Sequence, residues 1–574
     1  MMGAWYRHND VKQFEGRMMN KLSLLDQVFY KLEAGGMSPL LMAGTMIVDP
    51  RSSPYPLNGK KLADHLAARM EKIPLMRQKL VQDSLKIGDM RLVDDPEFDV
   101  KNHITLTKLK APGNYGQLMD CLGAFSAQRL DLTRPLWHYE IIEGLEGGRI
   151  AVATHLHHCI LDGIGARQAL GSMWDEKPVP AEKPSQREWE VEETPSAFSL
   201  LWDALKENAE RLYVKAPTFI YHNRSPLTQA LLKSLSASIR VKGETERKAG
   251  PIIPKVHKTS LNVSHVSAAR VISYVEFPFA EVKALGRHYD CSINDLALLF
   301  NSFALQHYFN GIGEKIDFDL VAGMPISTRT SSDGPGGNAV SVARLSLHNR
   351  IKGVEHRLRA IMRDTALIKK PLRPAADGNK PARLDSKALM GLVSPIVLDT
   401  LIYGAVKCKL AEKATLVNIA ITNVPGSQRP VYIAGARQVS MIPMGPVIDT
   451  VGMIITISSS DQHLSMGYHG CGEAITDKEL FVAGARKCFE ALKKAAKLKF
   501  DSDAKPAPKQ RAAKRPSVKT IAKKSAVAKK SVARTTAKKI AQKKNKSFDD
   551  FVARVTSSPT ITRMAKNRIA KASR

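Results

Sequence analysis

The sequence predicts an α/β protein in which mixed sheets are flanked by helices, followed by a basic tail that does not fold. Segments typical of strands alternate with segments typical of helices along the first 500 residues, the order that builds α/β folds. The chain has 574 residues, too many for one ordinary core, and its 44% hydrophobic content is enough to form two. The last part is instead rich in Lys, Ala, Pro, Ser and Thr, a composition that buries little apolar surface.

These patterns divide the chain into four segments. The prolines and charged residues that follow Pro178 mark the end of the first half and the start of a crossover. The predicted segments are a first half at 1–178, a helical linker or crossover at 179–258, a second half at 259–500 and a disordered tail at 501–574.

The first half is expected to begin with a helix that Ser23 caps. Strand-like alternation and helical periodicity then locate its other elements. The predicted strands are residues 41–48, 137–142 and 149–153, and the predicted helices are residues 62–72, 119–128 and 166–174. The turn Glu146-Gly147-Gly148 joins the last two strands, which are therefore expected to form a β-hairpin.

The crossover and the second half continue the alternation of helices and strands. Helices are predicted at 196–214, 227–239, 279–289 and from 291 through 307, strands at 271–277, 320–325, 339–347 and 451–458, and further apolar runs at 417–426 and 442–447. The loop from Asp333 to Asn338 is rich in glycine but leads into a strand. It also lacks the Lys and the Ser or Thr of a phosphate-binding loop, so we do not expect it to bind a nucleotide.

Two adjacent histidines stand where the second strand of the hairpin gives way to a loop, in the run from His157 to Gly163 (HHCILDG). If the strand persists to His158, the two side chains point to opposite faces, and only one imidazole can face a reaction. A histidine pKa of about 6.5 lets a neutral ring accept a proton near neutral pH, as a general base does. The alternative is that both are incidental core or surface histidines. Asp162 and Gly163 at this spacing favour the catalytic interpretation.

Other candidate sites have weaker signals. His103 is either a hidden functional histidine or, as we expect, a structural residue at the end of a strand. His155, His157 and Asp162 would suit a metal, because residues two apart on a strand share a face. A zinc site needs a further clear ligand, however, and none is evident, so no metal is predicted.

Cysteine usage and hydropathy bear on the compartment. The six cysteines are scattered, with no CxxC pair, which is typical of a reducing environment: Cys121, Cys159, Cys291, Cys408, Cys471 and Cys488. Residues 1–21 lack the apolar core of a signal peptide, and no run reaches about 18 uninterrupted apolar residues. We therefore expect a cytoplasmic protein whose membrane contact, if any, is peripheral.

From about Leu22 to Leu498 the chain resembles the wax ester synthase/acyl-CoA:diacylglycerol acyltransferase family of bacteria. The active-site signature of that family, HHxxxDG, matches residues 157–163, although other CoA-dependent acyltransferases and peptide-synthetase condensation domains share it. Further blocks resemble the family in its order: Leu22-Ser23 with Asp26, Pro135-Leu136-Trp137, Asn294-Asp295, Gly337-Asn338, Thr422-Asn423-Val424-Pro425-Gly426 and Pro443-Met444-Gly445-Pro446.

This resemblance implies a fold of two similar halves with a tunnel between them and the HHxxxDG loop at its middle. It implies that His158 is the general base, with His157 and Asp162 as supports and Gly163 as part of the motif. Transfer would be direct, without an acyl-enzyme and without a cofactor, because acyl-CoA is itself a substrate. Asn294 and Asp295 would help to position the site, but a helix cap formed by Ser292 or Asn294 is an equal or better interpretation.

The resemblance predicts fatty acyl transfer from acyl-CoA to diacylglycerol, and to long-chain alcohols as a further possibility. Two segments depart from the family. Ile326-Ser327-Thr328-Arg329 replaces the usual Ser-Leu-Arg, and the segment 451–456 lacks the usual Gly-Leu-Asn. Since these segments are expected on the acceptor side, the alcohol stays open, and a wax ester synthase or another HHxxxDG acyltransferase is the alternative.

The tail carries most of the excess charge and lies outside the resemblance. Residues 501–574 hold 22 Lys and Arg against 4 Asp and Glu, a net +18 of the total +31. This composition resembles linker-histone tails and favours phosphates, either in DNA or in anionic lipid at a membrane or lipid-droplet surface. The tail could also be merely solubilising. The rival from another functional class is a polyanion-binding protein with a silent acyltransferase scaffold, which the intact HHxxxDG motif argues against.

Overall fold

The computed structural model describes residues 21–160, 171, 174–178, 194–215, 253–327, 340–369, 393–408 and 415–497. These residues fall within one compact unit that ends at Lys499. Most of the predicted helix 166–174, the predicted helix 227–239, the loop 333–338 and the basic tail lie outside the described residues. The boundaries at 178, 258 and 500 stay predictions.

The first sheet has six strands in the order β11-β12-β1-β6-β5-β4. Their bounds are β11 Tyr432–Ile433, β12 Ala436–Met444, β1 Leu41–Asp49, β6 Ile150–His157, β5 Trp137–Glu143 and β4 Ile104–Lys108. Only the β4–β5 pair is parallel. The predicted hairpin is confirmed, because β5 and β6 pair antiparallel across a turn in which Gly147 and Gly148 have positive φ.

Helices cover both faces of this sheet. Successive side chains of β6 point to opposite faces, and most of them are buried, so both faces need a cover. Ile150 and Val152 face the cluster that includes Leu62 and Leu66 of α2 (Gly59–Met70). The intervening alanines face the cluster that includes α4 (Tyr115–Ala127). Further elements complete this part: α1 Leu24–Ala34, α3 Pro74–Arg77, β2 Gln78–Val81, β3 Arg91–Asp94 and α6 Ala197–Glu210.

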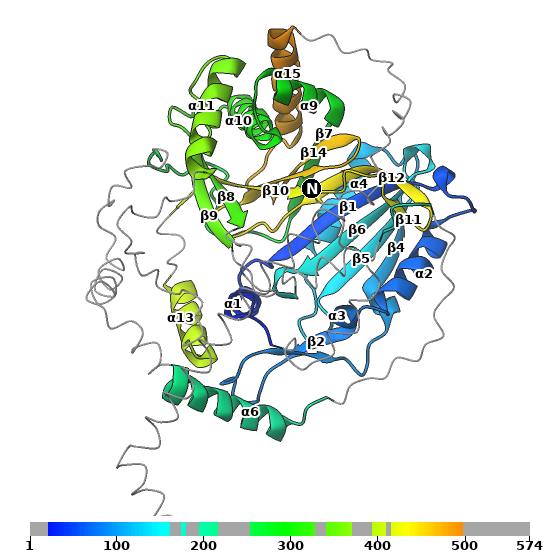
Figure 1. Cartoon of the computed structure of the whole chain (residues 1–574), viewed down its shortest axis with the longest axis vertical. Helices are drawn as coiled ribbons and strands as arrows, with labels where there is room; N and C mark the ends of the chain where they lie inside the picture. The colour runs from blue at the N-terminus through cyan, green and yellow to red at the C-terminus, as the bar shows by residue number, and fades with distance from the viewer. Residues whose placement is uncertain are drawn as a thin grey trace, which may run out of the picture. The chain divides into compact units, whose positions relative to one another are not determined.

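The second sheet is a mixed six-stranded sheet in the order β7-β14-β13-β10-β8-β9, in which β10 runs parallel to both its neighbours. Its strands are β7 Arg270–Pro278, β14 His463–Cys471, β13 Met453–Ser459, β10 Ile419–Pro425, β8 Val321–Ser327 and β9 Val340–Ser346. The helices α9 Phe279–His288, α10 Ile293–Gly311, α11 Val354–Lys369 and α15 Glu479–Ala496 lie on one face (Figure 1). The mixed sheets flanked by helices confirm the predicted α/β class.

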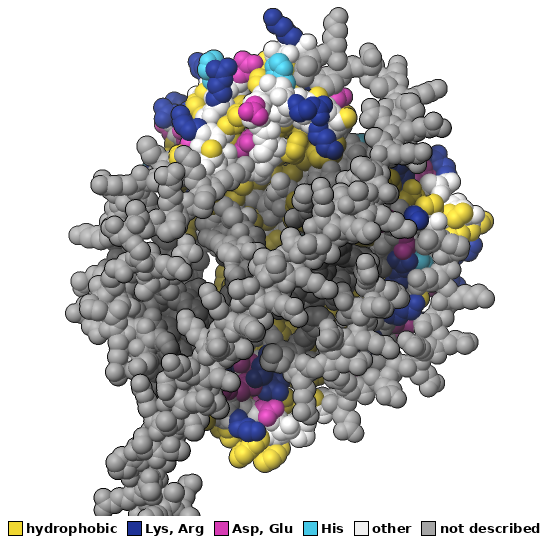
Figure 2. All heavy atoms as spheres, in the orientation of Figure 1, with side chains coloured by type: hydrophobic (Ala, Val, Ile, Leu, Met, Phe, Trp, Pro, Cys, Tyr) yellow, Lys and Arg dark blue, Asp and Glu magenta, His cyan; other side chains and the backbone are white. Residues whose placement is uncertain are grey.

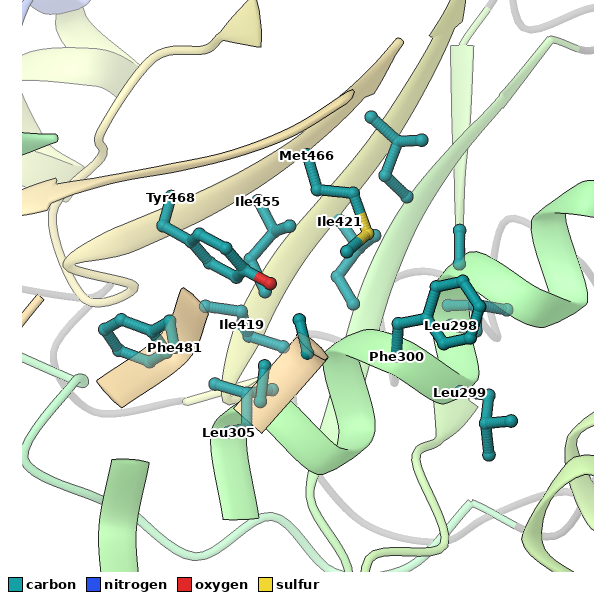
Figure 3. Close-up of a cluster of buried hydrophobic side chains, with 14 of the residues drawn as sticks. Leu298, Leu299, Phe300, Leu305, Ile419, Ile421, Ile455, Met466, Tyr468 and Phe481 are labelled. Carbon is teal, nitrogen blue, oxygen red and sulfur yellow. The ribbon is translucent and has the colours of Figure 1, made fainter. Parts of the chain in front are cut away.

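The core of the second half lies between α10 and the sheet. Leu298, Phe300 and Leu305 of α10 belong to the same buried cluster as Ile421 and Met466 of the strands (Figure 3). α10 begins where predicted, because Ser292 caps it and exchanges hydrogen bonds with Asp295 in a capping box. It continues to Gly311, one turn beyond the predicted end.

The two sheets are joined by a strand exchange that the residue pattern did not predict. β11 and β12, from late in the chain, belong to the first sheet, where β12 pairs with β1, although the strands before and after them in sequence, β10 and β13, belong to the second. Glu276 of β7 ties the sheets together: its Oε1 accepts hydrogen bonds from Ser440 Oγ of β12 at 2.8 Å and Ser465 Oγ of β14 at 2.9 Å. The second half of the sequence therefore completes the first sheet.

Most local predictions hold within a few residues, with one correction. Ser23 caps α1, its side chain accepting from the Asp26 N–H at 3.2 Å. His103 does not end a strand as predicted, because it closes a short 3-10 helix, Val100–His103, directly before β4. Asp99 causes this turn by accepting the Lys101 N–H at 3.0 Å. Within the described ranges, no helix is both long and apolar enough to cross a bilayer.

Candidate active site

The two histidines stand at the centre of the first sheet, where β6 ends. β6 includes His157, and the chain then enters a short 3-10 turn, His158–Ile160. The His157 N–H donates to Leu136 O at 3.0 Å, and the His158 N–H donates to Leu40 O at 2.8 Å. Backbone bonds to both flanking segments therefore hold the turn in place.

His157 is held at both ring nitrogens and is fully buried. Its Nε2 lies 2.9 Å from Oε2 of Glu33, whose side chain is 2% exposed. Its Nδ1 lies 3.1 Å from the Cys159 backbone nitrogen and accepts that N–H. An acceptor nitrogen carries no proton, so the proton of the neutral ring is on Nε2 and is donated to Glu33.

His158 is in a different environment. Its ring meets the ring of Phe29 edge to face, with centroids 4.8 Å apart, and is half-buried. Nδ1 is buried and has no hydrogen-bond partner in another described residue. Burial lowers the pKa of His158 below its ordinary value, and the neighbouring His157 adds to this, while contact with its own backbone opposes it. The ring is therefore neutral at neutral pH.

Helix α1 contacts both histidines, a role that the residue pattern missed. Phe29 and Glu33 are four residues apart and so share one face of α1. Phe29 contacts His158 and Glu33 contacts His157. The only signal in the sequence was an acidic residue one turn after an aromatic one, and that pattern does not reveal a partner in β6.

The remaining predicted site residues are not all brought together. Asp162 and Gly163 lie outside the described residues. Asp295 is buried at the first turn of α10, where its carboxylate accepts from the Ser292 N–H at 2.9 Å and from Thr365 Oγ at 2.7 Å. Asn294 is half-buried beside it. In the described part of the chain, no hydrogen bond or ring contact links either residue to the histidine turn.

Cys159 does not have the properties of a nucleophile. It is buried, and burial, together with the nearby carboxylates of Asp26 and Glu33, raises the pKa of its thiol well above the ordinary value. A nucleophilic cysteine needs a thiolate that is accessible to the substrate.

Two cavities lie beside β6, and His155 lines both. The smaller, about 10 Å³, lies between the sheets against His155, His469 and Arg270, and has room for about one water. Burial lowers the pKa of His155 to about 3 and that of His469 to about 4, so both rings are neutral. Among the described residues no cluster of three His, Cys, Asp or Glu side chains could hold a metal.

The larger cavity, about 400 Å³, opens at the ends of β5 and β6. Its wall includes Pro135 and Trp137, and the carbonyl between them, that of Leu136, accepts the His157 N–H. Arg129 and Arg134 add positive charge to its lining. The cavity therefore lies beside the segment that binds the backbone of His157, although neither His157 nor His158 is among its lining residues, and the two arginines suit part of an anionic substrate.

Comparison with protein families gives two matches that together span most of the described chain. Residues 22–297 match the wax ester synthase/diacylglycerol acyltransferase catalytic domain. Residues 336–493 match the C-terminal domain of the same class. The first match includes the histidine turn and the second includes β12.

Individual relatives and a solved structure agree with these matches. A probable diacylglycerol O-acyltransferase of Mycobacterium tuberculosis (strain CDC 1551/Oshkosh) is 27% identical over 476 residues, covering 83% of this chain and 96% of that protein. A putative diacylglycerol O-acyltransferase of the H37Rv strain is 26% identical over 490 residues, covering 83% and 98%. The wax ester synthase/diacylglycerol acyltransferase from Marinobacter aquaeolei VT8 has the same fold, with a TM-score of 0.56 at 21% identity, covering 83% of this chain and all of that one.

Proposed function

The chain belongs to the wax ester synthase/diacylglycerol acyltransferase family of acyl-transferring enzymes, and we propose that it acylates the hydroxyl of diacylglycerol from a fatty acyl-CoA. The relatives named as diacylglycerol O-acyltransferases support this acceptor. Acyl-CoA is a substrate in this scheme, and no further cofactor takes part.

His158 is the proposed general base. It takes the proton of the acceptor hydroxyl as that oxygen attacks the thioester carbonyl and forms a tetrahedral intermediate. The intermediate collapses, the carbon–sulfur bond breaks, and the protonated ring returns its proton to the CoA thiolate.

One observation carries this assignment: the two histidines differ in the partners of their ring nitrogens. Both nitrogens of His157 are engaged, by Glu33 and by the Cys159 N–H. The His158 side chain makes no hydrogen bond to another described residue, and its lowered pKa supplies the neutral form that a base requires. The buried thiol of Cys159 supports direct transfer without an acyl-enzyme.

The deciding experiment follows release of the CoA thiol from palmitoyl-CoA by the purified full-length protein, with diacylglycerol or hexadecanol as acceptor. The proposal expects thiol release and triacylglycerol when diacylglycerol is supplied. A preference for hexadecanol would instead indicate a wax ester synthase. Absence of thiol release with both acceptors would contradict acyl transfer.

We further propose that the enzyme works at a membrane or lipid-droplet surface, where diacylglycerol resides. Helix α6 supports this, because Phe198, Trp202 and Leu205 are 77%, 55% and 48% exposed. Figure 2 shows a yellow, hydrophobic area at its foot, where Figure 1 places α6. Arg91 holds the other side of the helix through Asp203 at 3.0 Å and Glu207 at 2.6 Å. Amphipathic helices with exposed aromatic residues bind lipid interfaces.

The basic tail offers a second anchor, to anionic lipid or to DNA, since its net +18 favours phosphates. Removing residues 505–574 and comparing binding to DNA and to anionic liposomes across salt concentrations distinguishes the two. Unchanged binding to both would contradict either role.

A further inference from the structure

We propose that Glu33 is a positioning residue for the reaction and that it acts through His157 on the turn that carries His158. This inference rests on the acyl-transfer function proposed above. Glu33 lies in α1, 124 residues before His157, and no part of the HHxxxDG motif contains it.

A chain of hydrogen bonds runs from Glu33 to the histidine turn. Glu33 Oε2 accepts from His157 Nε2 at 2.9 Å, and His157 Nδ1 accepts the Cys159 N–H at 3.1 Å. The ring thus links the carboxylate to the backbone on the far side of His158. Without Glu33, the ring would lose one of the two bonds that prevent its rotation.

Helix α1 also contacts His158, the proposed base. The Phe29 ring contacts the His158 ring, and Phe29 and Glu33 share one face of α1. The helix is itself anchored, by the Ser23 cap at its start and by an ion pair between Lys31 and Asp399 at 2.5 Å. α1 therefore sets the orientation of both imidazoles with respect to each other.

The carboxylate of Glu33 is buried together with the ring of His157. The side chains of Glu33 and His157 are 2% and 0% exposed. A buried carboxylate that accepts from a neutral imidazole gives little net stability, because both groups lose their hydration when they are buried. The pair does hold the His157 ring in one orientation and one tautomer. This keeps the His157 bond to the Cys159 N–H, and so the backbone on both sides of His158, in place.

The chain contains a matched control for this test. His348 Nε2 lies 2.8 Å from Asp364 Oδ2, a second largely buried pair of imidazole and carboxylate, between the end of β9 and α11. It belongs to the second half, and no hydrogen bond or ring contact in the described part of the chain connects it to the histidine turn. Asp364→Asn replaces the carboxylate of that pair by an amide, as Glu33→Gln does at the histidine turn, in a place where positioning of His158 is not at stake.

The experiment compares the full-length variants Glu33→Gln, Glu33→Met and Asp364→Asn with the wild type, measuring kcat, KM for palmitoyl-CoA and thermal unfolding. Glu33→Met has no acceptor and should lower kcat on the order of 10- to 100-fold, part of the roughly 10²–10⁴-fold that a general base contributes. KM should change less than about threefold, because the side chains of Glu33 and His157 are buried and neither is proposed to bind substrate. Glu33→Gln keeps an acceptor for Nε2–H and should recover most of the kcat. Asp364→Asn should change stability alone.

A second readout does not depend on turnover. The ring ¹⁵N signals of His158, assigned by their loss in His158→Ala, should shift in Glu33→Met and stay in place in Asp364→Asn. If Glu33→Met leaves both kcat and these signals unchanged, Glu33 is only structural and the inference is wrong. If the wild type releases no CoA, the proposed function fails, and the His158 signals still decide whether Glu33 positions the ring.

Discussion

Gly467 of β14 lies against Pro443 of β12 with no room for a side chain. A Cβ on the glycine would come within 1.8 Å of the proline carbonyl oxygen. β14 belongs to the second sheet and β12 completes the first, so this approach brings the backbones of the two sheets together. The contact adjoins the strand exchange that joins the two halves.

Gly467→Ala should therefore destabilise the protein by about 3 kcal/mol, because a backbone oxygen cannot move aside as a flexible side chain would. Chemical denaturation monitored by circular dichroism measures the change. Gly404→Ala is the control, since that glycine lies in α13 (Pro395–Lys407) with nothing within 4 Å of the added carbon, and it should stabilise by about 0.5–1 kcal/mol. Equal stabilities of the two variants would contradict the close approach.

His158→Ala should lower kcat by roughly 10²–10⁴-fold while the fold persists, because the half-buried ring is the proposed base. Thiol release under saturating palmitoyl-CoA provides the measurement, and thermal unfolding provides the check on folding. His307→Ala, on α10, is the matched control and should keep its activity. Retention of more than about a hundredth of the wild-type kcat would rule out His158 as general base.

The pH dependence of kcat/KM should reflect the lowered pKa of His158. A base acts in its neutral form, and burial keeps that form populated to lower pH than for an ordinary histidine. Activity should therefore be level through neutral pH and fall only below about pH 6.5, the ordinary value. A pH profile in buffers of constant ionic strength tests this, and a midpoint above that value would contradict the assignment.

Cys159→Ala should leave kcat within a few fold of the wild type. The substitution keeps the backbone N–H that His157 accepts and removes only a buried thiol whose pKa is raised. A loss of stability of about 1 kcal/mol is expected from the small cavity. Mass spectrometry of the enzyme during turnover should detect no acylated protein. An acylated Cys159, or a loss of kcat beyond about 100-fold in a folded variant, would indicate a covalent route instead.

Asp295→Ala should reduce stability and spare kcat. Its carboxylate caps α10 and accepts from Thr365 of α11, so its loss should cost about 1–2 kcal/mol. Denaturation and thiol release measured on the same preparation separate the two effects. Asn294→Ala at the adjoining position should change neither by much. A selective loss of kcat in either variant would assign this pair to the active site after all.

Local patterns predicted the elements well because burial and capping act over a few residues. Alternation located β6, and the Gly147-Gly148 turn placed β5 beside it, since antiparallel neighbours need only a short connection. Ser23 and Ser292 located helix starts for the same local reason. His103 was misplaced because an aspartate-capped turn in front of a strand resembles the strand's own end in the sequence.

The sequence by itself determined the α/β class, the histidine turn and the family, because each depends on residue types at short spacing. The three-dimensional packing was needed to show which histidine has no hydrogen-bond partner among the other described residues, since Glu33 reaches His157 across 124 residues. It also decided that β12 completes the first sheet beside β1. Side-chain periodicity shows which face of an element is apolar, but the choice among distant partners depends on packing of the whole chain.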